Sequence, residues 1–203
     1  MEPLKFFNEG QVYEVLLVTR SNVAPVGVVR KGRRFSFKLF GGKSAGELRE
    51  HPYAAIQITN DVELMSRLAL NFEVTLEFEE REKHRWIKGL PGLYGEVEIR
   101  EEEHEDELGK TQILRCSLEP EGFIEGSLPP RPLSRADFHL IEMAVHLTRL
   151  LEAVKNRKPE IAKNLYNLVM LNYSMYKRFG GSSEIAEIMA ELAGNSYVQD
   201  STD

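Results

Sequence analysis

The sequence predicts an α+β fold in which a closed antiparallel β-barrel is followed by a C-terminal helical unit. Between Val12 and Leu118 the apolar residues alternate with polar ones or form short β-branched bursts, which is typical of strands. A proline-rich segment with Pro129, Pro130 and Pro132 then rules out a regular strand ladder. Beyond this segment the apolar residues recur at helical spacing, which predicts helices.

Seven segments of the first part are predicted as strands, because they combine apolar alternation with β-branched or aromatic residues. Residues 43–52 and 60–70 lie between them and have the spacing of short helices. The sheet therefore has no long helical crossovers, which favours an antiparallel barrel. The predicted strands are residues 12–19, 23–29, 34–40, 53–59, 72–80, 94–101 and 111–118.

The helical unit is predicted to begin at Ser134, an N-cap residue with Asp137 in the third helical position. Apolar residues continue at helical spacing from 138 to 154 and again from 161 to 175, which predicts two long helices. A third helix is expected within residues 179–192, where glycines and serines precede an acidic first turn.

Two domains follow from this change of pattern. The barrel domain is assigned to residues 1–128 and the helical unit to residues 129–203. The tail, residues 195–203, is expected to fray. The acidic run 100–110 is predicted to be a solvated loop, because its like charges repel one another. A metal site around His104 is the alternative, but the run has no fixed ligand geometry.

Composition excludes several classes of function. A balance of 26 basic and 32 acidic residues gives a formal charge of −6, which disfavours nucleic acid and anionic membranes as partners. No apolar run approaches the roughly 20 residues that span a bilayer. Cys116 is the only cysteine, so an intrachain disulfide is excluded. No N-terminal signal segment is visible, and a cytoplasmic location is expected.

A phosphate-binding turn is predicted where the strand ending at Phe40 meets Gly41, Gly42, Lys43 and Ser44. Glycines let backbone N–H groups approach an anion, while the lysine, the hydroxyl and a helix N-terminus add favourable interactions. A nucleoside-triphosphate P-loop is excluded, because its first glycine position is occupied by a phenylalanine.

An S-x-x-E capping box formed by Ser44 and Glu47 is the alternative interpretation of this turn. In that case Ser44 would begin the helix and Lys43 would simply be solvated. Capping boxes are common where helices begin, so this segment taken alone favours the capping box, and the phosphate interpretation depends on the neighbouring strand 23–29.

The strand 23–29 is unusual, because it contains Pro25 and Gly27. Proline lacks a ladder N–H and glycine lacks a side chain, so the strand can present bare backbone to a flat ring. Asn22 and the amides of Val23, Ala24 and Val26 are candidate hydrogen-bonding groups for such a ring. A hairpin around residues 30–33 would place this strand beside the phosphate turn. An edge strand or a bulge is the alternative.

Residues 22–29, 38–70 and 133–153 resemble an uncharacterised, largely archaeal family of FMN-binding split-barrel proteins with a helical C-terminal extension. The resemblance implies a flavin-reductase-like split barrel, usually a homodimer, with FMN near the subunit interface. On this basis the ring side is assigned to Asn22, Ala24, Pro25, Val26 and Gly27. The phosphate side is assigned to Phe40, Gly41, Gly42, Lys43 and Ser44, with Thr59 and Asn60 as additions.

Two positions depart from the family pattern. Family members often carry an aromatic residue and an asparagine where this sequence has Ala45 and Glu47. The carboxylate of Glu47 would repel a phosphate dianion unless it turned back into the capping box.

Other chemistry-bearing residues give weaker predictions. His139, Glu142 and His146 share a helical face, but the following helix offers no further ligands in its body, which favours a polar network with Glu142 paired to His146 or Arg149. Trp86 is interpreted either as a cover for a flavin or as ordinary strand packing. The sequence does not indicate whether His51 and His84 lie near the flavin or are exposed on the surface.

The function expected from the sequence is that of an FMN flavoprotein, an oxidoreductase with an unknown small-molecule redox partner and no nominated catalytic side chain. A non-enzymatic FMN carrier or sensor is the second hypothesis. A helical metal-binding protein is the third.

Overall fold

The computed structural model describes residues 3–128, 132 and 134–200, which form two compact units. The barrel unit lies within Met1–Asn60, Thr75–His104 and Lys110–Pro130. The helical unit lies within Asp61–Val74, Glu105–Gly109 and Arg131–Asp203. A helix inserted into the first half of the chain and the tip of one hairpin thus belong to the helical unit.

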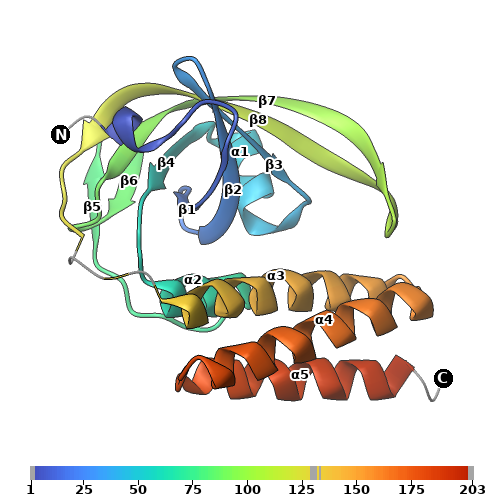
Figure 1. Cartoon of the computed structure of the whole chain (residues 1–203). Coiled ribbons are helices and arrows are strands. Elements are labelled where there is room, and N and C mark those ends of the chain that lie inside the picture. The colour runs from blue at the N-terminus through green and yellow to red at the C-terminus, as the bar shows by residue number, and fades with distance from the viewer. Residues whose placement is uncertain (1–2, 129–131, 133, 201–203) are drawn as a thin grey trace. The chain divides into compact units, whose positions relative to one another are not determined.

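Six antiparallel strands close the predicted barrel (Figure 1). The strand order is β1-β2-β3-β8-β7-β4, and β4 pairs with β1 to close the cylinder. A short 3-10 helix, η1 (Pro3–Phe6), precedes it, and helix α1 (Gly42–Glu50) connects β3 to β4. The strands are β1 (Val12–Val18), β2 (Val23–Lys31), β3 (Arg34–Leu39), β4 (Tyr53–Gln57), β7 (Gly92–Asp106) and β8 (Gly109–Ile124).

The barrel core follows from the two-residue alternation of strands. Val15 and Leu17 of β1 lie opposite Val26 and Ala24 of β2 on the same face, and the first three of these are buried in the core. The core is completed by Phe35 and by other apolar side chains of β3, α1, β4, β7 and β8. The hairpin predicted around residues 30–33 is present, since β2 ends at Lys31 and β3 begins at Arg34.

A separate two-stranded sheet was not predicted correctly. Strand β5 (Phe78–Arg81) covers only the end of the predicted strand 72–80, and its partner β6 (His84–Ile87) was missed. The side chain of Gln57 holds β6 in place by donating to the carbonyls of Ile87 and Leu90 and accepting from the N–H of Ile87. This interaction is long-range, so local strand propensity did not reveal it.

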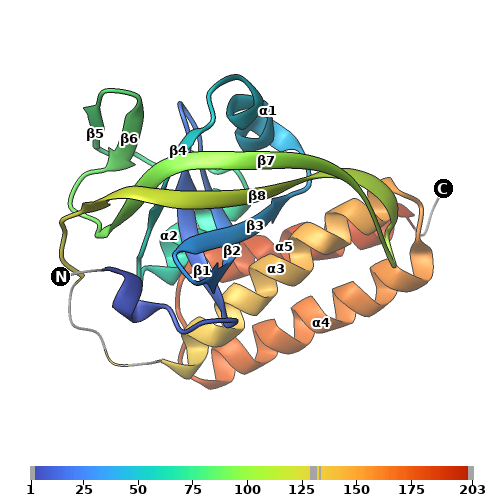
Figure 2. The same cartoon turned by 90° about the horizontal axis from the view of Figure 1, so that it is seen from above.

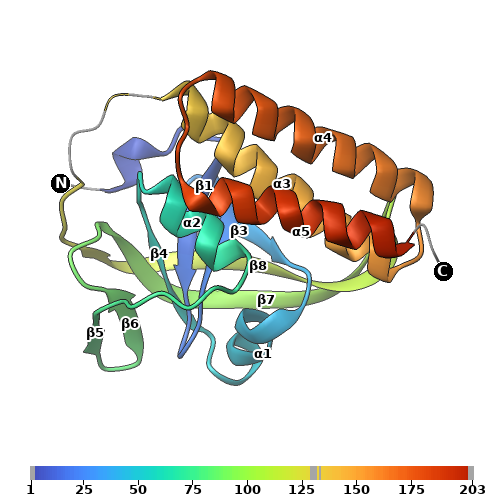
Figure 3. The same cartoon turned by 90° about the horizontal axis from the view of Figure 1, so that it is seen from below.

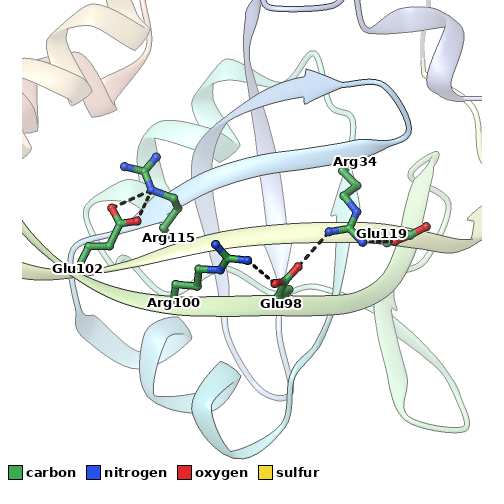
Figure 4. Close-up of polar contacts among 6 residues, drawn as sticks. All are labelled: Arg34, Glu98, Arg100, Glu102, Arg115 and Glu119. Atoms are coloured by element: carbon green, nitrogen blue, oxygen red, sulfur yellow. Dashed lines mark hydrogen bonds and ion pairs between the residues drawn. The ribbon is translucent and has the colours of Figure 1, made fainter.

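The acidic run 100–110 is not a loop, and the prediction was wrong. Strand β7 continues to Asp106 and β8 begins at Gly109, so the two form one long hairpin (Figure 2). Basic side chains of the neighbouring strands lie against the acidic ones, and opposite charges across strands favour pairing. Within the run, Glu103 lies 3.3 Å from Lys110 and Glu102 lies 2.8 Å from Arg115. Figure 4 shows the pair Arg115–Glu102 and, next to the run, Arg34 bridging Glu98 and Glu119 with Arg100 beside Glu98.

The described residues of the helical unit form four helices. The three long ones pack side by side around a buried apolar cluster that includes Met143, Leu147, Val169 and Met189 (Figure 3). Helix α5 continues to Asp200, so residues 195–200 are helical rather than frayed. Residues 201–203 of the predicted tail lie outside the described residues, as do Pro129 and Pro130. The helices are α2 (Val62–Ala69), α3 (Arg135–Lys155), α4 (Pro159–Arg178) and α5 (Glu184–Asp200).

Bilayer-spanning helices are absent from the described part of the chain, since none of its helices is long and apolar enough.

Candidate functional site

Helix α1 begins earlier than the capping-box interpretation requires. Its N-cap is Gly41, with φ 102°, and Gly42 follows with φ 77°. Both values lie in the left-handed region that glycine tolerates best, so the glycine pair is needed to turn the chain from β3 into the helix. None of the side chains that the structure describes caps the first turn. The backbone N–H groups of its first residues therefore have no partner within the helix.

The capping box between Ser44 and Glu47 is not formed. Ser44 lies inside the first turn and is 4% exposed. Its hydroxyl accepts a hydrogen bond from the side-chain amide of Asn22, with 2.8 Å between Nδ2 and Oγ. The two predicted halves of the site are thus in contact, since Asn22 immediately precedes β2 and Ser44 belongs to the phosphate turn.

Strand β2 has an edge that is unpaired over most of its length. The N–H of Thr19 donates to the carbonyl of Asn22 at 2.9 Å and closes the two-residue β1–β2 turn. Hydrogen-bonded and non-hydrogen-bonded pairs alternate from there, so Pro25 opposite Leu16 falls in a non-hydrogen-bonded pair. The missing N–H of Pro25 therefore faces away from β1 and costs no ladder bond.

The other edge of β2 meets β3 only at residues 29–31. Along residues 23–28 no strand in the described part of the chain pairs with this edge. The same alternation turns the amides of Val23 and Gly27 toward the open edge and those of Ala24 and Val26 toward β1. Of the three amides suggested by the sequence, only that of Val23 is therefore available, and Gly27 provides a second one.

Glu47 extends from α1 to the β1–β2 turn. Its Oε2 accepts from the Thr19 hydroxyl at 2.6 Å and from the Ser21 N–H at 2.9 Å, and its Oε1 accepts from the Ser21 hydroxyl at 2.5 Å. We call these interactions the Glu47 clasp. Thr19 and Ser21 were not identified from the sequence. Hydroxyl residues in and beside a two-residue turn are the only local signal that could have pointed to them.

The clasp determines the ionisation of Glu47. Partial burial alone would raise the pKa of this carboxyl group. The hydrogen bonds from the Ser21 hydroxyl, the Thr19 hydroxyl and the Ser21 N–H oppose it, and the positive charge of Lys43 adds to them. Together they lower the pKa of Glu47 below its ordinary value of 4.5, so the group is a carboxylate at neutral pH.

Stability is expected to depend on pH through Glu47. Because its pKa is lower in the folded chain, its stabilisation is present above the pKa of the unfolded chain and is lost as the pH falls through the folded-state pKa. Glu47→Gln should therefore unfold at lower urea concentration than the wild type near neutral pH. The difference should shrink below the ordinary value of 4.5. A difference that stays constant across a pH series would contradict this assignment.

The remaining candidate residues are more scattered. Lys43 is exposed, and the exposed Phe40 has its ring edge-to-face with His104 at 5.6 Å. Thr59 and Asn60 follow β4, whose Gln57 shares a row with Leu16 and Pro25. Because β1 lies between β4 and β2, Gln57 is about 10 Å from Pro25, which is two strand spacings, and Thr59 and Asn60 lie on the segment that follows Gln57.

An aromatic and histidine cluster beside β6 was also not recognised. His84 is buried, its Nε2 lies 3.0 Å from Glu121, and its ring contacts those of Tyr53 and Tyr94. Trp86 stacks on Tyr94 with 5.3 Å between ring centroids, which is strand packing within the barrel unit.

His51 joins this cluster at its edge. Its ring lies 5.1 Å from that of Tyr53, and its Nε2 is 2.8 Å from the carbonyl of Lys83. The sequence offered no way to place these histidines, because the β5–β6 hairpin that brings them together was not predicted.

The predicted polar network in the helical unit is present in part. His146 pairs with Glu142 at 3.4 Å, whereas Arg149 pairs with Glu107. His139 lies beside Asn172. Among the described residues no three histidine, cysteine or acidic side chains come together as a metal site.

Cys116 is not a candidate nucleophile. Its thiol is buried in the barrel core, and this burial raises its pKa to about 12. The thiolate, which is the reactive form, is therefore disfavoured.

Comparison with known proteins identifies relatives of both units. Residues 13–125 match the family model described as "Protein of unknown function (DUF447) N-terminal domain", and residues 134–192 match "Protein of unknown function (DUF447)". The uncharacterized protein MJ1453 of Methanocaldococcus jannaschii is 27% identical over 195 residues, which cover 88% of this chain and 96% of that protein.

A solved structure has the same fold. It is the crystal structure of the FMN-bound protein MM1853 from Methanosarcina mazei, with a TM-score of 0.65 and 21% identity. The match covers 95% of this chain and 99% of that one. The predicted barrel with C-terminal helices is thereby confirmed as a known architecture.

Proposed function

The chain belongs to the DUF447 family, and from this membership and the geometry of β2 and α1 we propose that it is an FMN-binding flavoprotein. The observation that carries the proposal is the hydrogen bond between Asn22 and Ser44, which joins a strand with an open edge to an uncapped helix start. The FMN-bound protein MM1853, which shares the fold, supports it.

The start of α1 fits the phosphate group. The N–H groups of the first turn have no partner within the helix, and the helix dipole favours an anion at this end. Gly41 and Gly42 carry no side chain that would keep an anion away, while Lys43 is exposed beside them. Ser44 accepts from Asn22, so its own hydroxyl proton is free to be donated to a phosphate oxygen.

The open edge of β2 fits the flavin ring. An isoalloxazine ring has hydrogen-bond donors and acceptors along its pyrimidine edge, which unpaired strand backbone can address. Val23 and Gly27 present N–H groups there, and their carbonyls and that of Pro25 are acceptors. Pro25 places no N–H on this edge, and Gly27 has no side chain, although the side chains of Val12 and Glu14 lie 3.3 Å from where its Cβ would be.

Bound flavin would supply the redox chemistry, and the chain would bind and orient it and limit its access to water. We propose a flavin-dependent oxidoreductase acting on a small-molecule redox partner. Stopped-flow reduction tests this step, because rapid bleaching by a nicotinamide or deazaflavin donor supports an enzyme. Inertness to each donor would indicate the carrier or sensor function instead.

The visible spectrum of freshly purified protein tests FMN binding directly. Bound oxidised flavin absorbs blue light, and titration of colourless protein with FMN should restore this absorption. A protein that is colourless and cannot be reconstituted with FMN would overturn the proposal. The homodimer expected from the family resemblance stays a prediction, which sedimentation analysis of the same sample tests.

A further inference from the structure

Glu47 poses an electrostatic problem for the proposed function. It lies on α1 one turn after Lys43, so its carboxylate is close to the turn assigned to the phosphate. The negative charges of this carboxylate and of a bound phosphate would repel each other, and the repulsion should weaken FMN binding. A residue with only this effect would reduce the affinity of a mononucleotide site.

The contacts of Glu47 provide a compensating role. Both carboxylate oxygens are engaged by the β1–β2 turn, through the hydroxyls of Thr19 and Ser21 and the N–H of Ser21. Ser21 directly precedes Asn22, whose carbonyl is bound by Thr19 and whose side chain binds Ser44. The clasp therefore restrains the residues on which the orientation of Asn22 depends.

We propose that Glu47 is a positioning residue of the flavin site, which clasps the β1–β2 turn and so holds Asn22 and the start of β2 in register with Ser44. This inference rests on the proposed FMN binding, and it assigns Glu47 no contact with the flavin itself. Accurate placement of groups that must bind one ligand together reduces the entropy lost on binding.

The clasp also orients the Ser44 hydroxyl. The Asn22 amide donates to Ser44 Oγ, so it occupies an acceptor position of that oxygen and leaves the proton to be donated elsewhere. Without the clasp, Asn22 could rotate away, and the hydroxyl would lose this constraint. Charge repulsion and positioning thus predict opposite effects when Glu47 is removed.

Two substitutions at Glu47 separate these effects. Glu47→Ala removes both the charge and the clasp, and it is expected to weaken FMN binding about tenfold. Riboflavin binding should weaken by a similar factor, because a β1–β2 turn that is no longer held in place also affects the side of the site that binds the ring. Glu47→Gln removes the charge but keeps an acceptor of the same shape, and its FMN affinity should stay within about threefold of the wild type. Glu50→Ala is the matched control, since it removes the same charge from the exposed last residue of α1.

Fluorescence titration with FMN and with riboflavin measures these affinities. Weaker binding by Glu47→Ala, with near-normal binding by Glu47→Gln and Glu50→Ala, supports the clasp. Equal or tighter FMN binding by Glu47→Ala would overturn it, because Glu47 would then act only as a repelling charge.

Hydrogen–deuterium exchange of residues 19–24 in the ligand-free proteins provides a readout that does not need flavin. Exchange should be about tenfold faster in Glu47→Ala than in the wild type, and unchanged in Glu50→Ala. Unchanged exchange in Glu47→Ala would refute the clasp even if FMN binds. If the wild type does not bind FMN, the proposed function fails, while the exchange result still decides whether Glu47 holds the turn.

Discussion

Replacing Lys43 by alanine is expected to weaken FMN about 30-fold, or about 2 kcal/mol, while leaving riboflavin affinity nearly unchanged. FMN and riboflavin differ only by the phosphate group, so a contact made to the phosphate alone should discriminate between them. Lys43 is exposed beside the uncapped start of α1, where its ammonium group can reach a bound phosphate. A charge-assisted hydrogen bond of this kind is among the stronger polar contacts in proteins.

Lys31 provides the matched control for this experiment. It is an exposed lysine at the far end of β2, beside the β2–β3 turn, so Lys31→Ala removes the same charge without touching the predicted phosphate turn. Fluorescence titration at two ionic strengths should show that salt weakens FMN binding more in the wild type than in Lys43→Ala. Equal losses for FMN and riboflavin in Lys43→Ala would show that Lys43 does not act on the phosphate.

Replacing Gly95 by alanine is expected to lower the free energy of unfolding of the barrel by about 3 kcal/mol or more. A Cβ atom at this position in β7 would lie 2.0 Å from the carbonyl oxygen of Glu119 and 3.1 Å from the N–H nitrogen of Glu121. Both contacts are with the backbone of β8, which cannot move aside as a flexible side chain can. Relief of the clash would require the β7–β8 pairing to shift.

Gly46→Ala is the control for the Gly95 experiment. Gly46 lies in α1, and a Cβ atom added there would meet no neighbouring atom within 4 Å, so alanine should stabilise the helix by up to about 1 kcal/mol. Urea unfolding followed by circular dichroism measures both variants. A Gly95→Ala protein with wild-type stability would mean that β7 and β8 do not approach each other this closely.

Most of the barrel could be predicted because its strands carry their own signal. The alternation in residues 12–19 and 34–40 identified β1 and β3, since a half-buried strand must place apolar side chains on every second position. The same reasoning failed for the acidic run 100–110, because Glu102 and Glu103 form ion pairs across the hairpin with Arg115 and Lys110 of β8. Local charge repulsion was evident in the sequence, but its compensation was not.

The segments that form the candidate site could be predicted from the sequence, but the hydrogen bonds between their side chains could not. The glycine pair at the start of α1 and the proline in β2 stand out in the sequence because each serves a backbone requirement that few other residues meet. The alternative interpretation of the sequence folded Glu47 back onto Ser44, a residue three positions away. The structure instead joins Glu47 to Thr19 and Ser21, and Ser44 to Asn22, across 22 or more positions of the chain.

By itself, the amino-acid sequence determined the class of fold, the positions of the barrel strands β1, β2, β3 and β4, and the two segments that are candidates for holding a mononucleotide. These depend on periodicity and on backbone requirements, which act over a few neighbouring residues. Tertiary structure alone decided which hydroxyl meets which carboxylate, which edge of β2 stays open and where β6 packs. Such choices depend on side chains that are distant in the chain and become neighbours only when the barrel closes.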